Sequence, residues 1–233
     1  MSAPAAPPLA PRDAYRLWAP AYEAETAVSF LDDRLVAELS PPLAGVRLLD
    51  AGCGTGRRLR AVRGPALAVG ADLTWEMLAA GRSGDGDGDS PPLLAAADVR
   101  ALPFASAAFD VAWCRLVVGH LARLDEAYAE VGRVTRPRGA AIVTDFHPAA
   151  ARAGHTRSFR TADGRVHAVE HHVHEMGDHV HAASAAGLEF VDWRDGAVGP
   201  ELRPFYAAAG RLGRFAADEG LPVVLALSFR RVD

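Results

Sequence analysis

Residues 47–57 read RLLDAGCGTGR: an apolar run ends in an acid, and three glycines at alternate positions follow it. The apolar run is typical of a buried parallel strand, and a basic, helix-forming segment comes after the glycines. Glycine suits the turn between them because it adopts positive φ angles and lets a ligand approach the backbone closely. The N–H groups at the helix start favour a polar or anionic group nearby. The segment therefore predicts a strand, a tight turn and a helix start beside a bound ligand.

The glycine spacing distinguishes between possible ligands. The dinucleotide fingerprint G-x-G-x-x-G places its third glycine where this chain has Arg57, and Gly56 comes one residue early. A phosphate-binding loop would need a Gly-Lys-Ser/Thr ending, which is not present. The form G-x-G-x-G with an acid before it resembles motif I of the class I S-adenosylmethionine (SAM)-dependent methyltransferases. The resemblance implies SAM as cofactor, S-adenosylhomocysteine (SAH) as product, and cofactor contacts from Asp50, Ala51, Gly52, Cys53, Gly54 and Gly56.

A second predicted strand ends in Asp72, about 20 residues beyond Asp50. A carboxylate in this place can accept both ribose hydroxyls of an adenosine group, because it offers several acceptor sites and no donor. The alternative is an acid that merely caps the next helix. Leu73 and Met77 follow on the next helical turn and would flank the adenine.

A third predicted strand, at residues 93–99, also ends in an acid, Asp98. The pattern D-x-x-x-L-P-F followed by F-D-V resembles the corresponding segment of the methyltransferase family. The resemblance implies that Asp98 receives the adenine amino group and that Val99 contributes a backbone N–H. Cys114 and Arg115 end a fourth strand, where family members hold the cofactor ammonium with a backbone carbonyl.

Strands separated by helices predict an α/β fold with a doubly wound, mostly parallel sheet of seven strands. The resemblance, which is to small-molecule enzymes similar to the ubiquinone/menaquinone-biosynthesis methyltransferases, is continuous to about residue 146 and implies the Rossmann-like methyltransferase fold. Residues 83–92 are predicted to be a solvated linker. We predict a disordered tail (1–12) and one domain (13–233), which consists of a helical lid (13–42), a SAM-binding core (43–146), a substrate-side insertion after the fifth strand (147–181) and the C-terminal part of the sheet (182–233).

The predicted lid carries aromatic side chains. Residues 15–23, YRLWAPAYE, resemble the Tyr-Asp-x-x-Ala-x-x-Tyr-Asp segment before motif I in many small-molecule methyltransferases, apart from Arg16 and Glu23. In that family the segment covers the cofactor, which implies cofactor contacts for Tyr15 and Tyr22. The alternative is an amphipathic helix whose aromatic side chains belong to the core.

Methyl transfer to oxygen, nitrogen or carbon requires removal of a proton, and histidine is the side chain best suited to that role near pH 7. His147 is the first candidate for the catalytic base because it leaves the fifth strand at the carboxyl edge, where open α/β sheets bind their ligands. His120 is the second candidate. For each, the alternative is a core or capping histidine.

The insertion after the fifth strand is rich in histidine and arginine. Arginines such as Arg152 and Arg157 could hold an acidic group of the substrate. Histidines here could bind a metal, but no His-Glu-x-x-His or comparable cluster occurs, so no metal is predicted. The interpretation that we prefer is a substrate pocket. Its predicted residues are Arg152, His155, His171 and His174.

Composition limits the partners. The net charge of −4 gives no basic field for nucleic acid, and no stretch approaches a membrane-spanning length or forms a signal peptide. The two cysteines match no metal or redox spacing, which favours a cytoplasmic setting. We expect a small-molecule methyl acceptor and no nucleic-acid or membrane partner, and the sequence carries no signal for an oligomeric state.

Two other functions share parts of these motifs. A SAM-binding regulatory protein would have every cofactor residue but no productive acceptor pocket. A nucleotide-cofactor oxidoreductase is disfavoured by Arg57 and the early Gly56. The function predicted from the sequence is SAM-dependent methyl transfer to a small molecule.

Overall fold

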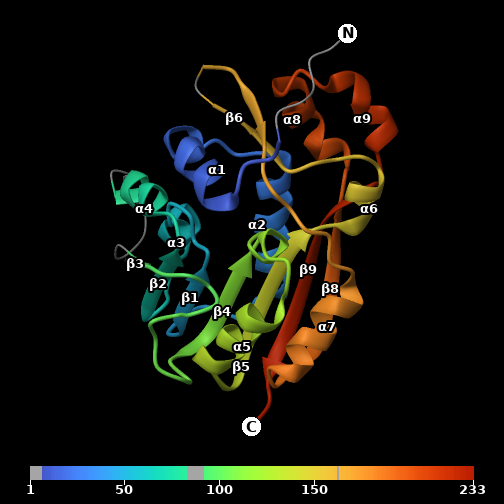
Figure 1. Ribbon diagram of the computed structural model, residues 1–233. Helices are drawn as coiled ribbons and strands as arrows, with labels where there is room; N and C mark the ends of the chain where they lie inside the picture. Colours follow the sequence, from blue (N-terminus) through green and yellow to red (C-terminus); the bar gives the residue numbers. More distant parts are fainter. Residues whose placement is uncertain (1–6, 83–91, 162) are drawn as a thin grey trace.

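A computed structural model describes residues 7–82, 92–161 and 163–233 (Figure 1). Residues 1–6 of the predicted tail and 83–91 of the predicted linker lie outside these ranges. The strands of the described chain are β1 (Arg47–Ala51), β2 (Leu67–Asp72), β3 (Leu93–Ala96), β4 (Phe109–Arg115), β5 (Thr135–Phe146), β6 (Ser158–Arg160), β7 (Val166–Ala168), β8 (Leu188–Ala197) and β9 (Pro222–Arg231).

Helices precede β1, β2, β3 and β5, whereas the described connection from β3 to β4 contains no helix. The α-helices are α1 (Pro11–Trp18), α2 (Ala27–Leu39), α3 (Arg57–Ala61), α4 (Trp75–Arg82), α5 (Asp125–Val134), α6 (Pro148–Arg152), α7 (Met176–Ala185), α8 (Arg203–Ala208) and α9 (Leu212–Asp218). Short 3₁₀ turns are η1 (Ala19–Ala21), η2 (Val118–His120) and η3 (Pro200–Leu202). No helix among the described residues is both long and apolar enough to cross a membrane.

Seven strands form one sheet in the order β3-β2-β1-β4-β5-β9-β8. Strands β1 to β5 are mutually parallel, and β9 runs antiparallel between β5 and β8. The carboxyl ends of the parallel strands therefore meet at one edge of the sheet. The predicted doubly wound, mostly parallel, seven-stranded sheet is confirmed.

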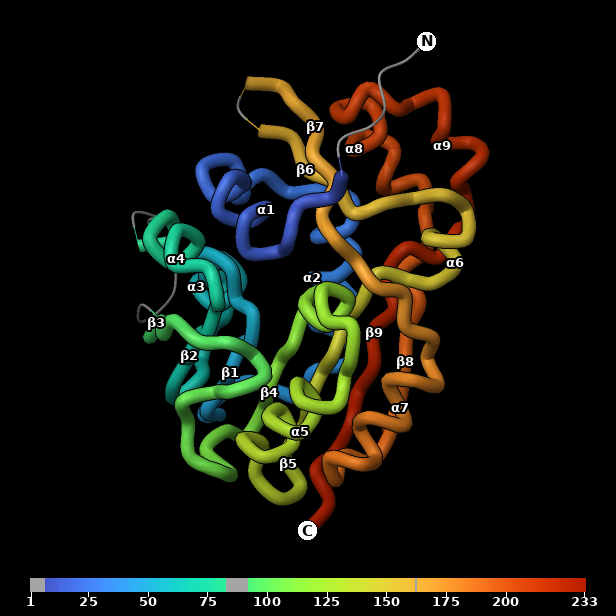
Figure 2. The backbone as a smooth tube through the Cα atoms, viewed as in Figure 1, coloured from blue at the N-terminus to red at the C-terminus, as the bar shows by residue number. Residues whose placement is uncertain are grey.

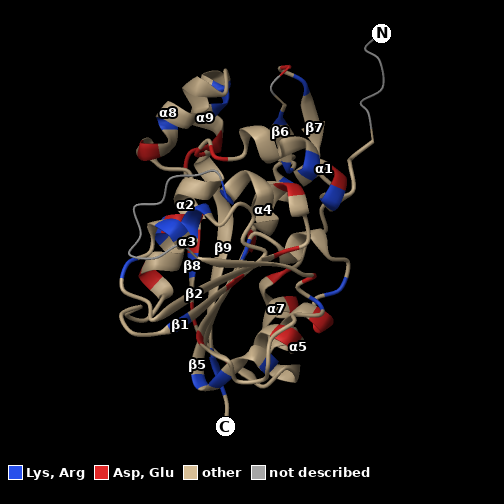
Figure 3. Ribbon diagram, turned by 90° about the vertical axis from the view of Figure 1, so that its left-hand side faces the viewer, with Lys and Arg blue, Asp and Glu red and all other residues tan. Residues whose placement is uncertain are grey.

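Both faces of the sheet are covered, as parallel strands require. Successive residues of β1 point to opposite layers: Leu49 packs in a cluster with Ala127 and Val131 of α5, and Leu48 packs in a cluster with Val36 of α2. Figure 3 shows α5 and α7 on one side of the sheet and α2 and α3 on the other. The continuous burial of β1 after Arg47 follows from this double cover.

Three segments lie beyond the carboxyl edge of the sheet: α1, the hairpin of β6 and β7, and the pair α8–α9 (Figures 1 and 2). The lid begins earlier than predicted, because Leu9 pairs with Val169 next to the hairpin and α1 starts at Pro11. The predicted tail of residues 1–12 is therefore too long. Trp18 of α1 stacks on Phe159 of the hairpin, with ring centroids 5.1 Å apart.

Candidate functional site

A cavity of about 920 Å³ opens at the carboxyl edge of the sheet, between the strand ends and the three segments above them. Eleven predicted site residues line it: Tyr15, Tyr22, Gly52, Gly54, Asp72, Leu73, Asp98, Val99, Arg115, His120 and His155. Ten others do not: Asp50, Ala51, Cys53, Gly56, Met77, Cys114, His147, Arg152, His171 and His174. The cavity thus joins the predicted cofactor residues of the core to residues of the lid and the insertion.

The glycine turn presents bare backbone to this cavity. Gly52 and Gly54 have φ angles of +84° and +59°, a region that side chains disfavour. A Cβ on Gly52 would lie 2.1 Å from Cγ2 of Val117, and one on Gly54 would lie 3.2 Å from the ring of Tyr22. Substitution at Gly52 would therefore close the space beside the turn.

Asp72 ends β2 beside the glycine turn. Its carboxylate accepts hydrogen bonds from the N–H of Gly54 and from the N–H of Thr74, both at 2.8 Å. Burial raises the pKa of Asp72, and these backbone donors oppose that shift. The carboxylate is thus fixed at the cavity wall, with lone pairs that remain for the hydroxyls of a bound ligand.

Asp98 and Val99 follow β3 and line the same cavity. The guanidinium of Arg100 lies 2.7 Å from the Asp98 carboxylate and holds the pKa of that group below its usual range. Val99 is almost fully buried. Asp98 and Asp72 therefore share one cavity.

Asp50 lies behind the glycine turn and is 1% exposed. Within the described residues, neither of its carboxylate oxygens has a hydrogen-bond partner. Burial raises the pKa of Asp50 to about 6, although the positive charges of Arg115 and Arg58 oppose the shift. An unsatisfied buried carboxylate under a bare backbone turn fits a cationic ligand, and SAM carries both an ammonium and a sulfonium.

The cofactor contact predicted at Arg115 would be made by a backbone carbonyl, and the side chain of Arg115 has a separate role. It forms a buried ion pair with Asp32 at 2.7 Å and also contacts Asp33. Arg58 of α3 bonds to the same two acids, at 3.1 Å and 2.7 Å. This buried network ties α2 to the helix that starts at the glycine turn. Sequence reasoning missed Asp32 and Arg58, because no motif marks a pairing between helices so far apart in the chain.

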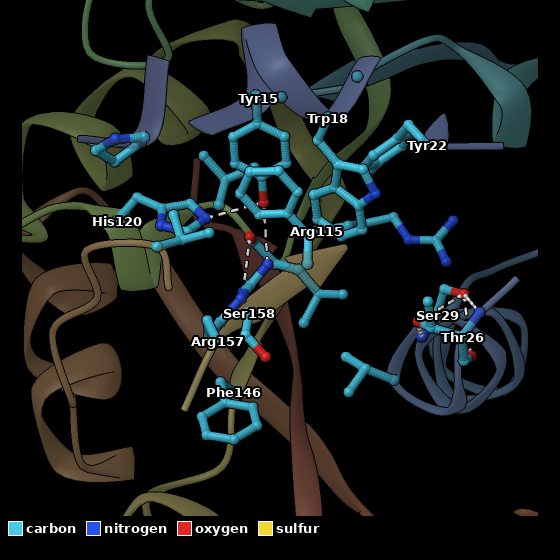
Figure 4. A pocket seen from close by; sticks show the side chains of 18 of the residues that line it. Tyr15, Trp18, Tyr22, Thr26, Ser29, Arg115, His120, Phe146, Arg157 and Ser158 are labelled. Carbon is cyan, nitrogen blue, oxygen red and sulfur yellow. Dashed lines mark hydrogen bonds between the residues drawn. The ribbon is translucent and has the colours of Figure 1, made fainter. Parts of the chain in front are cut away.

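His120 lies at the end of η2 and lines the cavity, where its ring faces Tyr15 (Figure 4). Its Nδ1 is 3.0 Å from the carbonyl oxygen of Glu170, so Nδ1 carries the proton and donates it. Its Nε2 is 3.0 Å from the hydroxyl of Tyr15 and accepts from it. Arg157 donates to the same hydroxyl at 3.1 Å. These hydrogen bonds link Arg157 of the insertion, Tyr15 of the lid and His120 of the core.

Burial is the largest cause of the pKa shifts of His120 and Tyr15. Burial lowers the pKa of His120 to about 3, and the positive charge of Arg157 acts in the same direction. Burial also raises the pKa of Tyr15 to about 12. His120 is therefore neutral and Tyr15 is un-ionised near pH 7.

His147, the first candidate for the base, does not line the cavity. Its Nδ1 accepts the N–H of Ala149 and caps α6, and its Nε2 lies 3.4 Å from Asp195 on β8. The structure thus gives His147 the capping contacts that were its alternative interpretation.

The four predicted substrate residues are separated. Only His155 lines the cavity, where its Nε2 lies 3.1 Å from the buried carboxylate of Asp218. Arg152 pairs with Glu175 at 2.5 Å on the surface. His171 packs edge-on against Phe146 with ring centroids 5.5 Å apart, and Nε2 of His174 bonds to the carbonyl of Leu121 at 2.8 Å. Within the described ranges, no group of three or more potential ligand side chains is arranged to hold a metal ion.

A second polar cluster lies inside the core, between β5, α5 and α7. The Tyr128 hydroxyl is 3.0 Å from Nδ1 of His179, and Nε2 of His179 is 3.6 Å from the carboxylate of Asp145. Burial raises the pKa of Asp145 to about 7 and lowers that of His179 to about 4. At neutral pH the cluster therefore holds an uncharged histidine beside a carboxyl group that is close to its titration midpoint.

The titration of Asp145 predicts a pH effect on stability. The folded protein keeps this proton up to about pH 7, whereas an unfolded chain releases it near pH 4. Stability from this group is thus lost as pH rises between these values. In urea unfolding, Asp145→Asn should gain stability relative to wild type between pH 5 and pH 8. Asp192→Asn, an exposed acid with a lowered pKa, should show no such trend, and a constant difference for Asp145→Asn would contradict the prediction.

The fold and the cavity define the class of the protein: it has the Rossmann-like fold of SAM-dependent methyltransferases. It is similar to the crystal structure of a SAM-dependent methyltransferase from Mesorhizobium loti, with a TM-score of 0.63, 22% identity and coverage of 84% of this chain and 95% of that chain. It is also similar to the [4+2]-cyclase SpnF, with a TM-score of 0.58, 22% identity and coverage of 86% and 80%. At these identities the likeness establishes the fold alone.

The sequence comparison finds similarity to methyltransferases over the central part of the chain. Residues 49–143 match the family model Methyltransf_11, described as a methyltransferase domain. The chain is 36% identical over 122 residues to a malonyl-[acyl-carrier protein] O-methyltransferase of Pseudescherichia vulneris (52% of this chain, 47% of the relative). It is 40% identical over 112 residues to a ubiquinone/menaquinone biosynthesis C-methyltransferase of Dinoroseobacter shibae (45% and 44%). The chain spans about half the length of the curated relatives it matches.

Proposed function

We propose that this protein is an enzyme that transfers the methyl group of SAM to an oxygen, nitrogen or carbon atom of a small molecule. One observation carries the proposal: a single cavity is lined by the glycine turn, by Asp72 and Asp98, and by the hydrogen-bonded pair of Tyr15 and His120. A SAM-binding regulator would need the first set of residues and would have no use for the second. The names of the relatives support a small acceptor, since they include a malonyl carrier-protein and a quinone-pathway methyltransferase.

Residues of the core would hold the cofactor. Asp72 would accept the ribose hydroxyls, Asp98 and the N–H of Val99 would bind the adenine, and Leu73 would cover one adenine face. The buried carboxylate of Asp50 would offset the cationic end of the cofactor from behind the glycine turn. Bound SAM supplies the activated methyl group. The protein therefore contributes mainly alignment, which can correspond to effective molarities of roughly 10⁵ M or more.

His120 would act as the base. In its neutral ring, Nδ1 holds the proton and donates it to the carbonyl of Glu170, so Nε2 has the lone pair that can accept another proton. The Tyr15 hydroxyl lies on that lone pair, so a proton released by the acceptor could pass to Tyr15 while Tyr15 gives its own to His120. As the acceptor atom gains the methyl group, its proton would thus end on Nε2. The lid and hairpin around this pair would limit access of water to the transfer.

The proposed cellular location is the cytoplasm. The two free thiols, Cys53 and Cys114, are both buried, and burial raises the pKa of each, which favours the reduced and unreactive form.

Ligand binding and product formation test the function in two stages. At 100-fold excess over the dissociation constant, SAH should raise the unfolding temperature by roughly 5–10 °C, and NAD and NADP should leave it unchanged. Incubation of SAM with a library of small metabolites should then release SAH with at least one of them. Stabilisation by NAD would indicate the oxidoreductase instead, whereas SAH binding without turnover would indicate the regulatory protein.

A further inference from the structure

Arg157 lines the cavity beside Tyr15 and His120. We call this part of the cavity, where the methyl acceptor would bind, the acceptor half. Arg157 lies just before β6, and its guanidinium points toward the Tyr15 hydroxyl (Figure 4). Nη1 donates to the carbonyl oxygen of Leu116 at 3.2 Å, and Nη2 donates to the Tyr15 hydroxyl at 3.1 Å. Both acceptors are neutral. The guanidinium of Arg157 therefore lies near His120, the proposed base, and neither of its two hydrogen-bond acceptors carries a negative charge.

Two other arginines of the cavity wall are neutralised by carboxylates. Arg58 and Arg115 line the same cavity and share the carboxylates of Asp32 and Asp33. For Arg157, in contrast, both side-chain hydrogen bonds go to neutral oxygens, and among the described residues it forms no ion pair within 4 Å. Its charge reaches the buried carboxyl of Asp145 only at longer range, where it opposes the rise in the pKa of that group that burial causes. A partly buried charge without a partner is costly, and a ligand that supplies the opposite charge recovers that cost.

We propose that Arg157 binds a carboxylate of the methyl acceptor, which makes the acceptor an organic acid. This inference rests on the proposed function, because it assigns a ligand to the acceptor half of that same site. Each terminal nitrogen of Arg157 uses one N–H on the protein and has a second N–H left, which suits the two oxygens of a carboxylate.

The neighbouring base would respond to such a ligand. The positive charge of Arg157 is one of the causes that lower the pKa of His120. An acceptor carboxylate paired with Arg157 would offset that charge, so His120 would become a stronger base when the acceptor is bound. Recognition of the acid and activation of the base would thus be coupled through one side chain.

Arg157 could instead bind the carboxylate of SAM, the cofactor of the proposed function. Arg57 is a better candidate for that group, because it directly follows the glycine turn, lines the cavity and donates to a carbonyl, that of Glu23, at 2.9 Å. If Arg157 held the cofactor instead, its loss would weaken SAH binding.

The test compares acids with their amides on the SAH-bound protein. The probes are benzoate with benzamide, 4-hydroxybenzoate with 4-hydroxybenzamide, and octanoate with octanamide, each titrated by calorimetry into wild type, Arg157→Gln and Arg165→Gln. Arg165 lies in the same hairpin and is 79% exposed outside the cavity, so its variant is a matched loss of one charge. In wild type at least one acid should bind tenfold or more tightly than its amide. Arg157→Gln should lose this preference and keep its SAH affinity, and Arg165→Gln should keep both.

The outcomes separate the two proposals. If wild type fails to bind SAH, the proposed function fails. If SAH binds but no acid is preferred to its amide, or if Arg157→Gln keeps the preference, the assignment of Arg157 to an acceptor carboxylate is wrong. A tenfold or greater loss of SAH affinity in Arg157→Gln would indicate that Arg157 binds the cofactor. That result would also contradict the assignment of Arg157 to an acceptor carboxylate. Unfolding curves of the three proteins check that each is folded.

Discussion

Replacement of Asp72 with alanine should lower the affinity for SAH by about 100-fold or more, as measured by calorimetry. The carboxylate is held by the N–H groups of Gly54 and Thr74 in a position where it would accept both ribose hydroxyls. Hydrogen bonds to a charged group contribute roughly 1.5–3 kcal/mol each, so the loss of two exceeds the 2.7 kcal/mol or so that corresponds to 100-fold. Asp72→Asn keeps one acceptor oxygen and should lose less.

Asp110 provides the matched control for this experiment. Its carboxylate also accepts a backbone N–H, that of Arg47 at 2.7 Å, but Asp110 lies near the start of β4, at the opposite edge of the sheet. Asp110→Ala should therefore leave SAH affinity unchanged. Equal losses in Asp110→Ala and Asp72→Ala would indicate a general effect on the sheet, and unchanged affinity in Asp72→Ala would end the ribose assignment.

Replacement of His120 with alanine should reduce kcat by about 10²- to 10⁴-fold, the usual contribution of a general base. SAH affinity should change little, because the ring of His120 bonds to Tyr15 and Glu170 and not to the glycine turn, Asp72 or Asp98. The measurements are SAH release under saturating SAM and acceptor, together with SAH binding by calorimetry. Tyr15→Phe should also lower kcat, since it removes the hydroxyl through which the proton would pass.

His147→Ala is the control histidine. It removes the cap of α6 and the contact with Asp195. A moderate loss of stability, about 1 kcal/mol, is expected from a lost cap, with kcat retained. If His147→Ala instead abolished turnover while His120→Ala remained active, the base would be the histidine that the sequence favoured first.

The cofactor half of the site was predictable because its signals are local. A strand, its terminal acid and the glycines after it are adjacent in the chain, and parallel strands bring successive carboxyl ends to one edge. The shared cavity of Asp72 and Asp98 follows from that geometry. The side chain of Arg115 was less predictable, since its partner Asp32 lies on a helix on the other side of motif I.

The acceptor half depends on contacts that no local pattern encodes. His120 meets Tyr15 and Glu170, which are separated from it by 105 and 50 positions. The position of His147 after β5 suggested a place in the cavity, but the helix that starts at Pro148 uses the ring as its cap. The histidines of the insertion differ in the same way: His155 lines the cavity and His174 lies against a backbone carbonyl behind it. Histidine content alone therefore did not identify the site.

The three segments above the sheet are α1, the hairpin of β6 and β7, and the pair α8–α9. In the chain, α1 precedes the first strand and the other two segments lie between strands of the sheet. Strands β6 and β7 pair with each other rather than with the seven-stranded sheet. Sequence changes there can alter which molecule is accepted without disturbing the register of the central strands. If the proposed function holds, exchange of the hairpin between homologous chains should accordingly change the methyl acceptor while SAM binding persists. Such interchangeable parts would allow one scaffold to diversify across many acceptors.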